Sequence, residues 1–151
     1  MTHDPEAPVT VHVGLPAGHD ASGQPVFEVL PARPLPSTHV RLLGSPGPVL
    51  GCAMGDVIRV GDDGGFEVVR HGGNLCVQAY RPGAFTPESY APLGEAAEEL
   101  DALVEAPRDL RFIVLTVGRA GGPAAVGRVM DAWAEGVDGA AWSFGNGESP
   151  A

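Results

Sequence analysis

The sequence predicts an α+β fold in which a small antiparallel β unit precedes a two-layer α/β sandwich. Up to about residue 73, short β-branched runs alternate with turns, and the whole chain holds 22 glycines and 15 prolines. From residue 74 onward, the pattern changes to strand, helix, strand, helix, strand. We therefore expect a β unit over residues 9–73, an α/β half over 74–145, and flexible tails over 1–8 and 146–151.

The clearest element of the first half is a β-hairpin. Two β-branched runs near 56–60 and 65–70 flank Asp62-Asp63-Gly64-Gly65, a sequence typical of a tight turn. This pattern explains Asp62 and Asp63 as turn residues instead of as a metal or acid–base pair. We expect Asp56 to face solvent or to cap the turn before it.

The other elements follow from periodicity. Strands are expected near 9–13, 26–30, 39–43, 74–80, 110–117 and 140–144. Apolar residues at helical spacing predict one helix over 93–105 and a second that opens at Gly121-Gly122-Pro123 and ends near Trp133. The residues expected to form one shared core are Val11, Val29, Leu42, Val57, Val69, Val77, Leu100, Phe112, Val114, Val129 and Trp133.

The charge of the chain limits its partners. Its net charge is −10, from 19 acidic and nine basic residues, and every basic residue is an arginine. The acidic residues are spread over both halves, and no basic patch gathers. Phosphate backbones and anionic membranes both attract concentrated positive charge, so we expect neither nucleic-acid nor membrane binding. A basic protein is the partner that this charge favours.

Cysteine usage and the lack of targeting signals are typical of a cytoplasmic protein. No run approaches the roughly 20 apolar residues that cross a bilayer, and we expect no secretory signal. Cys52 and Cys76 form no CxxC motif and are expected to be buried, reduced thiols. We therefore expect a cytoplasmic protein. No metal-ligand spacing or cofactor motif occurs, so we expect neither a metal nor a cofactor.

The layout resembles a bacterial domain family of unknown function, in which a small β unit centred on a Gly-Asp-Val motif precedes a ferredoxin-like half. The resemblance is carried by Val26-Phe27-Glu28-Val29, Gly55-Asp56-Val57-Ile58, the Asp62–Gly65 turn, Val68-Val69-Arg70 and the helix ending at Trp133. It implies a ferredoxin-like two-layer α/β sandwich over 74–145 and no activity. The family pattern has a β-hairpin between its two helices, whereas here only 110–117 lies between them. One strand is therefore expected to be missing or displaced.

Two groups of residues are candidate small-molecule sites. His12 and Glu28 fall on adjacent predicted strands, where they could meet as a polar pair, and with His71 they form a candidate polar site. Gly118, Arg119, Gly121 and Gly122 lie in a glycine-rich loop between a strand and a helix, where backbone N–H groups and the helix dipole favour an anion. The alternatives are surface histidines and a tight turn without a ligand.

The predicted helix over 93–105 presents a third candidate surface. Glu95, Glu98, Glu99 and Asp101 occupy the faces that its apolar residues leave free. Since no catalytic spacing is evident, the sequence favours a non-enzymatic, acidic accessory protein that binds a partner, with an immunity or antitoxin protein as a specific form. The alternative is an anionic-ligand module or small enzyme built on the 118–123 loop. An exposed sheet edge would also allow a homodimer.

Overall fold

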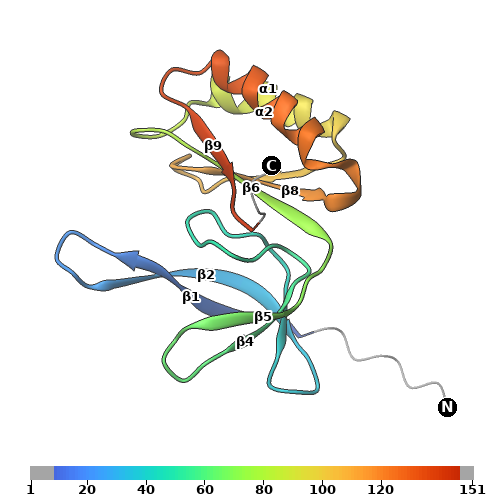
Figure 1. Ribbon diagram of the computed structural model, residues 1–151. Coiled ribbons are helices and arrows are strands. Elements are labelled where there is room, and N and C mark those ends of the chain that lie inside the picture. The colour runs from blue at the N-terminus through green and yellow to red at the C-terminus, as the bar shows by residue number, and fades with distance from the viewer. Residues whose placement is uncertain (1–8, 147–151) are drawn as a thin grey trace.

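The computed structural model describes residues 9–146, so the expected tail at 1–8 and residues 147–151 of the expected tail at 146–151 lie outside it. The tail prediction is wrong at residue 146, because Asn146 accepts a hydrogen bond from the N–H of Cys76 at 2.7 Å and donates to the carbonyl of Asn74 at 2.9 Å. The fold is α+β, with one five-stranded and one four-stranded antiparallel sheet and two α-helices. The two helices cover one face of the four-stranded sheet, and the five-stranded sheet lies on its other side (Figure 1). We call these the N-terminal sheet, of five strands, and the C-terminal sheet, of four.

In the N-terminal sheet, each strand pairs with the next one along the chain. The strands are β1 (Val11–His19), β2 (Pro25–Pro34), β3 (Val40–Leu42), β4 (Val57–Val60) and β5 (Phe66–Arg70). The predicted hairpin is confirmed as β4 and β5. Its turn is closed by the N–H of Gly61 donating to the carbonyl of Gly65 at 2.7 Å, while the Asp63 carboxylate accepts from the N–H of Gly65 at 2.9 Å.

The C-terminal sheet has the strand order β7-β8-β6-β9. The elements of this half are β6 (Asn74–Tyr80), α1 (Pro87–Glu99), β7 (Leu103–Glu105), β8 (Ile113–Gly118), the 3-10 turn η1 (Arg119–Gly121), α2 (Pro123–Glu135) and β9 (Ala141–Phe144). The predicted strand over 74–80 is confirmed with the same bounds. The strand expected to be missing between the helices is present as β7.

The predicted helix over 93–105 is wrong at both ends. It begins at Pro87, after the hydroxyl of Thr86 accepts a hydrogen bond from the N–H of Ser89 at 3.1 Å, as an N-cap does. It ends at Glu99, because Asp101 takes the left-handed backbone angle φ 53°. The apolar spacing of the following residues suits a helix and a short strand equally well, and the turn at Asp101 makes the last of them strand β7.

Most of the expected core positions are confirmed and two are wrong, and the expectation of one shared core is also wrong. Val77 and Trp133 belong to one buried cluster, Leu42 to a second and Val114 to a third. Leu42, Val57, Val77, Val114 and Trp133 are buried, while Val11, Leu100, Phe112 and Val129 are partly buried. Val29 and Val69 are 61% and 44% exposed. On β2 the buried row is formed instead by Leu30 and Ala32, which places Val29 on the opposite face of the strand.

The two faces of β6 serve different layers. Leu75, Val77 and Ala79 pack in the core beneath the two helices. Cys76 lies on the alternate face and packs with Ala53. That alternate face, which also carries Gln78, is turned toward the N-terminal sheet and positions the site described next.

Candidate functional site

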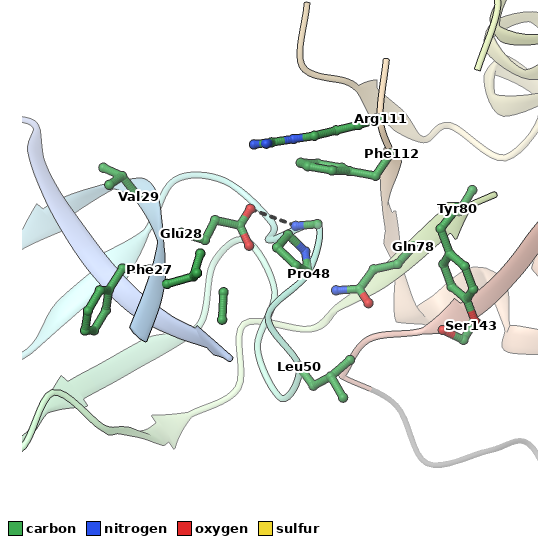
Figure 2. Close-up of a pocket in the computed structure, with 14 residues that line it drawn as sticks. Phe27, Glu28, Val29, Pro48, Leu50, Gln78, Tyr80, Arg111, Phe112 and Ser143 are labelled. Atoms are coloured by element: carbon green, nitrogen blue, oxygen red, sulfur yellow. Dashed lines mark hydrogen bonds between the residues drawn. The ribbon is translucent and has the colours of Figure 1, made fainter. Parts of the chain in front are cut away.

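A cleft of about 780 Å³ lies between the two sheets. Its walls come from β2, from the loop after β3, and from the ends of the strands of the C-terminal sheet (Figure 2). The main lining side chains are Val26, Glu28, Pro48, Leu50, Gln78, Tyr80, Arg111, Phe112 and Ser143. Its volume falls within the range of about 300–1,000 Å³ that is usual for ligand sites.

Much of the wall is apolar surface open to solvent. Leu50 is 65% exposed, Tyr80 is 47% exposed and Val26 is 39% exposed. Phe27 and Val29 also border the cleft, but Figure 2 shows their side chains on the other side of β2 from Glu28, as strand alternation requires. The cleft thus combines an apolar lining with the few polar groups of Glu28 and its neighbours.

The loop over residues 46–51 is fixed from both sheets and keeps the cleft open. The Glu28 carboxylate accepts hydrogen bonds from the N–H groups of Gly47 at 2.8 Å and Val49 at 3.2 Å. From the other side, the Gln78 amide donates to the carbonyls of Pro46 at 3.1 Å and Val49 at 2.7 Å. Because both sheets hold the loop, the cleft is formed before any ligand arrives.

Two charged groups face this region. Burial raises the pKa of the Glu28 carboxyl above its ordinary value, against the opposing effect of the Gly47 and Val49 amides and of Arg111. The Arg111 side chain is 68% exposed, and its Nε lies 3.9 Å from an oxygen of Asp109. Its guanidinium carbon is 5.5 Å from the ring centroid of Phe112. Figure 2 shows this guanidinium at the mouth of the cleft, on the side of Glu28.

The predicted contact between His12 and Glu28 is wrong. In the β1–β2 register, His12 lies opposite Pro31, and Glu28 lies opposite the buried Leu15. Residues directly opposite share a face, so His12 and Glu28 occupy opposite faces of the sheet. His71 is exposed in the turn between β5 and β6. The structure therefore separates the candidate polar site.

The glycine-rich loop adopts a closed turn. Arg119 is exposed, and its N–H donates to the carbonyl of Gly73 at 2.8 Å. The N–H of Gly122 donates to the carbonyl of Arg119 at 3.1 Å, and Pro123 at the start of α2 has no N–H. Two amides that the anion hypothesis requires are thus already bonded. Gly118 and Gly121 are exposed.

The acidic residues of α1 lie on the outer surface of the helical layer. Glu95, Glu98 and Glu99 are exposed on the helix, and Asp101 is exposed in the turn after it. Glu99 also borders a shallow groove of about 380 Å³ between α1 and α2. The remaining lining residues of this groove are Pro92, Ala96, Arg128, Val129, Ala132 and Trp133.

Both cysteines are buried free thiols, as predicted. Desolvation by burial raises the pKa of Cys52 to about 12 and that of Cys76 to about 12. The Cys76 thiol also donates to the carbonyl of Pro46 at 3.3 Å. Because the thiolate is the reactive form, neither thiol is activated as a nucleophile. Within residues 9–146, no three His, Cys, Asp or Glu side chains gather as a metal site.

Sequence reasoning missed the cleft, because its lining residues come from six separate segments of the chain. One signal was available in β6, where Gln78 interrupts the apolar run Leu75-Cys76-Val77. A long amide in the middle of a buried strand indicates a polar contact across the sheet. Nothing in the spacing connected it to Glu28 or Arg111.

Two antiparallel sheets with a layer of two helices define an α+β domain. Residues 28–142 match DUF4265, a domain of unknown function. The chain belongs to that family. The predicted resemblance to a domain family of unknown function is confirmed to this extent.

One solved structure shares the fold. It is a hypothetical protein from Neisseria gonorrhoeae, with a TM-score of 0.65 and 12% sequence identity. The match covers 93% of this chain and 96% of that one. No curated protein matches the chain. Among the described residues, none of the helices is long and apolar enough to cross a membrane.

Proposed function

We propose that this chain is a non-enzymatic accessory protein that binds a basic protein partner on the outer surface of its helical layer. The observation that carries the proposal is the placement of Glu98 and Glu99 in the last turn of α1. The carbonyl end of a helix carries partial negative charge, so carboxylates there destabilise it by about 0.3–1 kcal/mol each. The last turn of α1 holds no basic residue to offset them.

The surrounding charges add to this cost. Glu95 and Glu99 are four residues apart on the helix surface, and like charges at that spacing repel by about 0.2–0.5 kcal/mol. Within the described residues, the ion pairs are Arg59 with Glu67 and Arg111 with Asp109, and neither involves α1. Arg128 lines the same groove as Glu99 but forms no ion pair with it, so a cationic partner would relieve the repulsion among the α1 carboxylates.

The groove between α1 and α2 gives the same surface an apolar part. Pro92, Ala96 and Val129 contribute to its lining, and Glu99 lies at its border. An amphipathic basic segment would place apolar side chains in the groove and cationic ones against Glu95, Glu98 and Glu99. An immunity protein that neutralises a cationic toxin is the specific form of this proposal.

The remaining chemistry supports a binding role over an enzymatic one. The thiols have raised pKa values, and the structure separates His12 and His71 from Glu28. Two buried, unpaired cysteines suit a reducing compartment, so we place the complex in the cytoplasm as part of the same proposal.

We further propose that residues 74–145 form a ferredoxin-like sandwich. Support comes from the element order β6-α1-β7-β8-α2-β9, which has the β-α-β-β-α-β pattern of that topology. The strand order β7-β8-β6-β9, with antiparallel neighbours throughout, agrees with it.

Capture of the native partner tests the proposed surface. The full chain would be used as bait in extract of its own host, beside a Glu98→Lys/Glu99→Lys variant. A matched control is Glu135→Lys/Asp138→Lys, which makes the same change of charge near the end of α2. We expect one basic protein to bind the wild type and the control and to be lost with the α1 variant. Equal capture by all three proteins would overturn the proposal.

A further inference from the structure

We propose that the cleft between the two sheets binds a small amphipathic carboxylate, with an aliphatic or aromatic body and one anionic end. The cleft is lined from both sheets, whereas the two helices cover the other face of the C-terminal sheet (Figure 1). It is therefore independent of the partner surface proposed above.

The apolar body of such a ligand fits the exposed part of the wall. Leu50, Tyr80 and Val26 keep between 39% and 65% of their surface open in this cleft. The sheets do not close over these side chains, because the loop over 46–51 is hydrogen-bonded to Glu28 on one side and to Gln78 on the other. A ligand would bury this surface without reorganising the fold.

The polar groups of the cleft have unused hydrogen-bonding capacity. Gln78 is only 4% exposed, and its amide nitrogen donates to the carbonyls of Pro46 and Val49. Among the described residues, neither the Gln78 Oε1 nor the hydroxyls of Tyr80 and Ser143 form a hydrogen bond within the chain, and the buried side-chain atoms that lack a partner are instead the Nε atoms of Arg33 and Arg81. The Gln78 Oε1 and the two hydroxyls are therefore solvated in the cleft, where a ligand hydroxyl or amide would replace water.

Arg111 selects the anionic end. Among the described residues its guanidinium forms no side-chain hydrogen bond: its Nε lies 3.9 Å from an Asp109 oxygen, its charge acts on Glu28, and its guanidinium carbon lies over the Phe112 ring. Glu28, the nearby carboxylate, is occupied by the amides of Gly47 and Val49. The charged group with free donors is thus the cation, and a carboxylate fits its planar fork.

The test uses the full ¹⁵N-labelled chain titrated with octanoate and followed by amide chemical shifts. We expect shifts confined to residues 26–28, 47–50, 78–80, 111–112 and 143, with a dissociation constant on the order of 1 mM for so small a probe. Octanol, which has the same body without the charge, should bind about tenfold more weakly.

Matched variants locate the anionic end. Arg111→Gln should weaken octanoate binding about tenfold, while Arg119→Gln in the glycine-rich loop should leave it unchanged. Leu50→Asp should abolish binding, and Leu103→Asp, an exposed leucine on β7, should not. Shifts at the 118–123 loop, an unaffected Arg111→Gln variant, or the absence of saturable shifts would each overturn the inference. The Glu98→Lys/Glu99→Lys variant should bind octanoate normally, which separates this test from that of the partner surface.

Discussion

The carboxylate of Asp56 accepts a hydrogen bond from the N–H of Gly72 at 2.7 Å and thereby ties the turn before β4 to the turn after β5. Its other oxygen accepts from the N–H of Ala53 at 2.9 Å. Asp56 is 1% exposed, so of the two sequence expectations the cap is confirmed and the solvent-facing position is wrong. The Gly-Asp-Val motif thus holds together the turns before β4 and after β5, and the second of these turns leads into β6.

Removing this carboxylate should destabilise the fold strongly. Asp56→Ala leaves two backbone N–H groups without an acceptor, and we expect a loss of about 2–4 kcal/mol in the free energy of unfolding. Urea denaturation measures it. Asp63→Ala, which removes an exposed carboxylate bonded to the N–H of Gly65, is the control and should cost about 1 kcal/mol or less. Equal losses in the two variants would contradict this role for Asp56.

A second prediction concerns the close approach of Gly72 and Gly55. A Cβ on Gly72 would lie 2.3 Å from the carbonyl carbon of Gly55, so the backbone must move. Gly72→Ala should therefore destabilise the chain by about 1–3 kcal/mol. Gly94→Ala is its counterpart, because Gly94 lies within α1 with nothing near its missing Cβ. That variant should stabilise by about 0.5–1 kcal/mol, and thermal melting of both variants gives the comparison.

The raised pKa of Glu28 predicts a pH dependence of stability. When a carboxyl binds its proton more tightly in the folded state, protonation favours folding. Its contribution is fully present below the unfolded value, and it is lost as the pH rises through the folded pKa. Urea unfolding from pH 4 to 7 should show this loss of stability with rising pH in the wild type and not in Glu28→Gln. A parallel profile in the two proteins would show that Glu28 titrates normally.

Thiol reactivity supplies a further check. With pKa values of about 12, Cys52 and Cys76 should not react with a disulfide reagent at pH 8 until the chain unfolds. We expect two reacted thiols in urea and almost none in the native state, by absorbance of the released reagent. A Leu50→Cys variant, at a 65% exposed position, should react at once and serves as the positive control.

The sequence was sufficient to predict elements whose pattern is local. The β4–β5 turn and the bounds of β6 follow from residues that are neighbours in the chain. The end of α1 could not be predicted, because it depends on the backbone angle of Asp101. The face of β2 on which Val29 lies could not be predicted either. Both faces of β2 carry apolar residues, and only its register with β1 decides which face is buried.

Among the candidate sites, too, only those that depend on a local sequence pattern could be predicted. Exposure of the acidic side chains on α1 followed from helical periodicity. The cleft depends on contacts between segments far apart in sequence, such as Gln78 with Pro46, and no pattern within one segment indicates them. The pairing of His12 with Glu28 failed for the corresponding reason, because adjacent strands do not by themselves fix the register.

The central claim is that Glu98 and Glu99 serve partner binding at a cost to stability. The most direct measurement is the free energy of unfolding of the Glu98→Lys/Glu99→Lys variant by urea denaturation, together with its capture of the partner. We predict a gain of about 1 kcal/mol, since cations suit the end of α1, combined with loss of the partner. A variant that is less stable than the wild type, or that still binds the partner, would contradict the account.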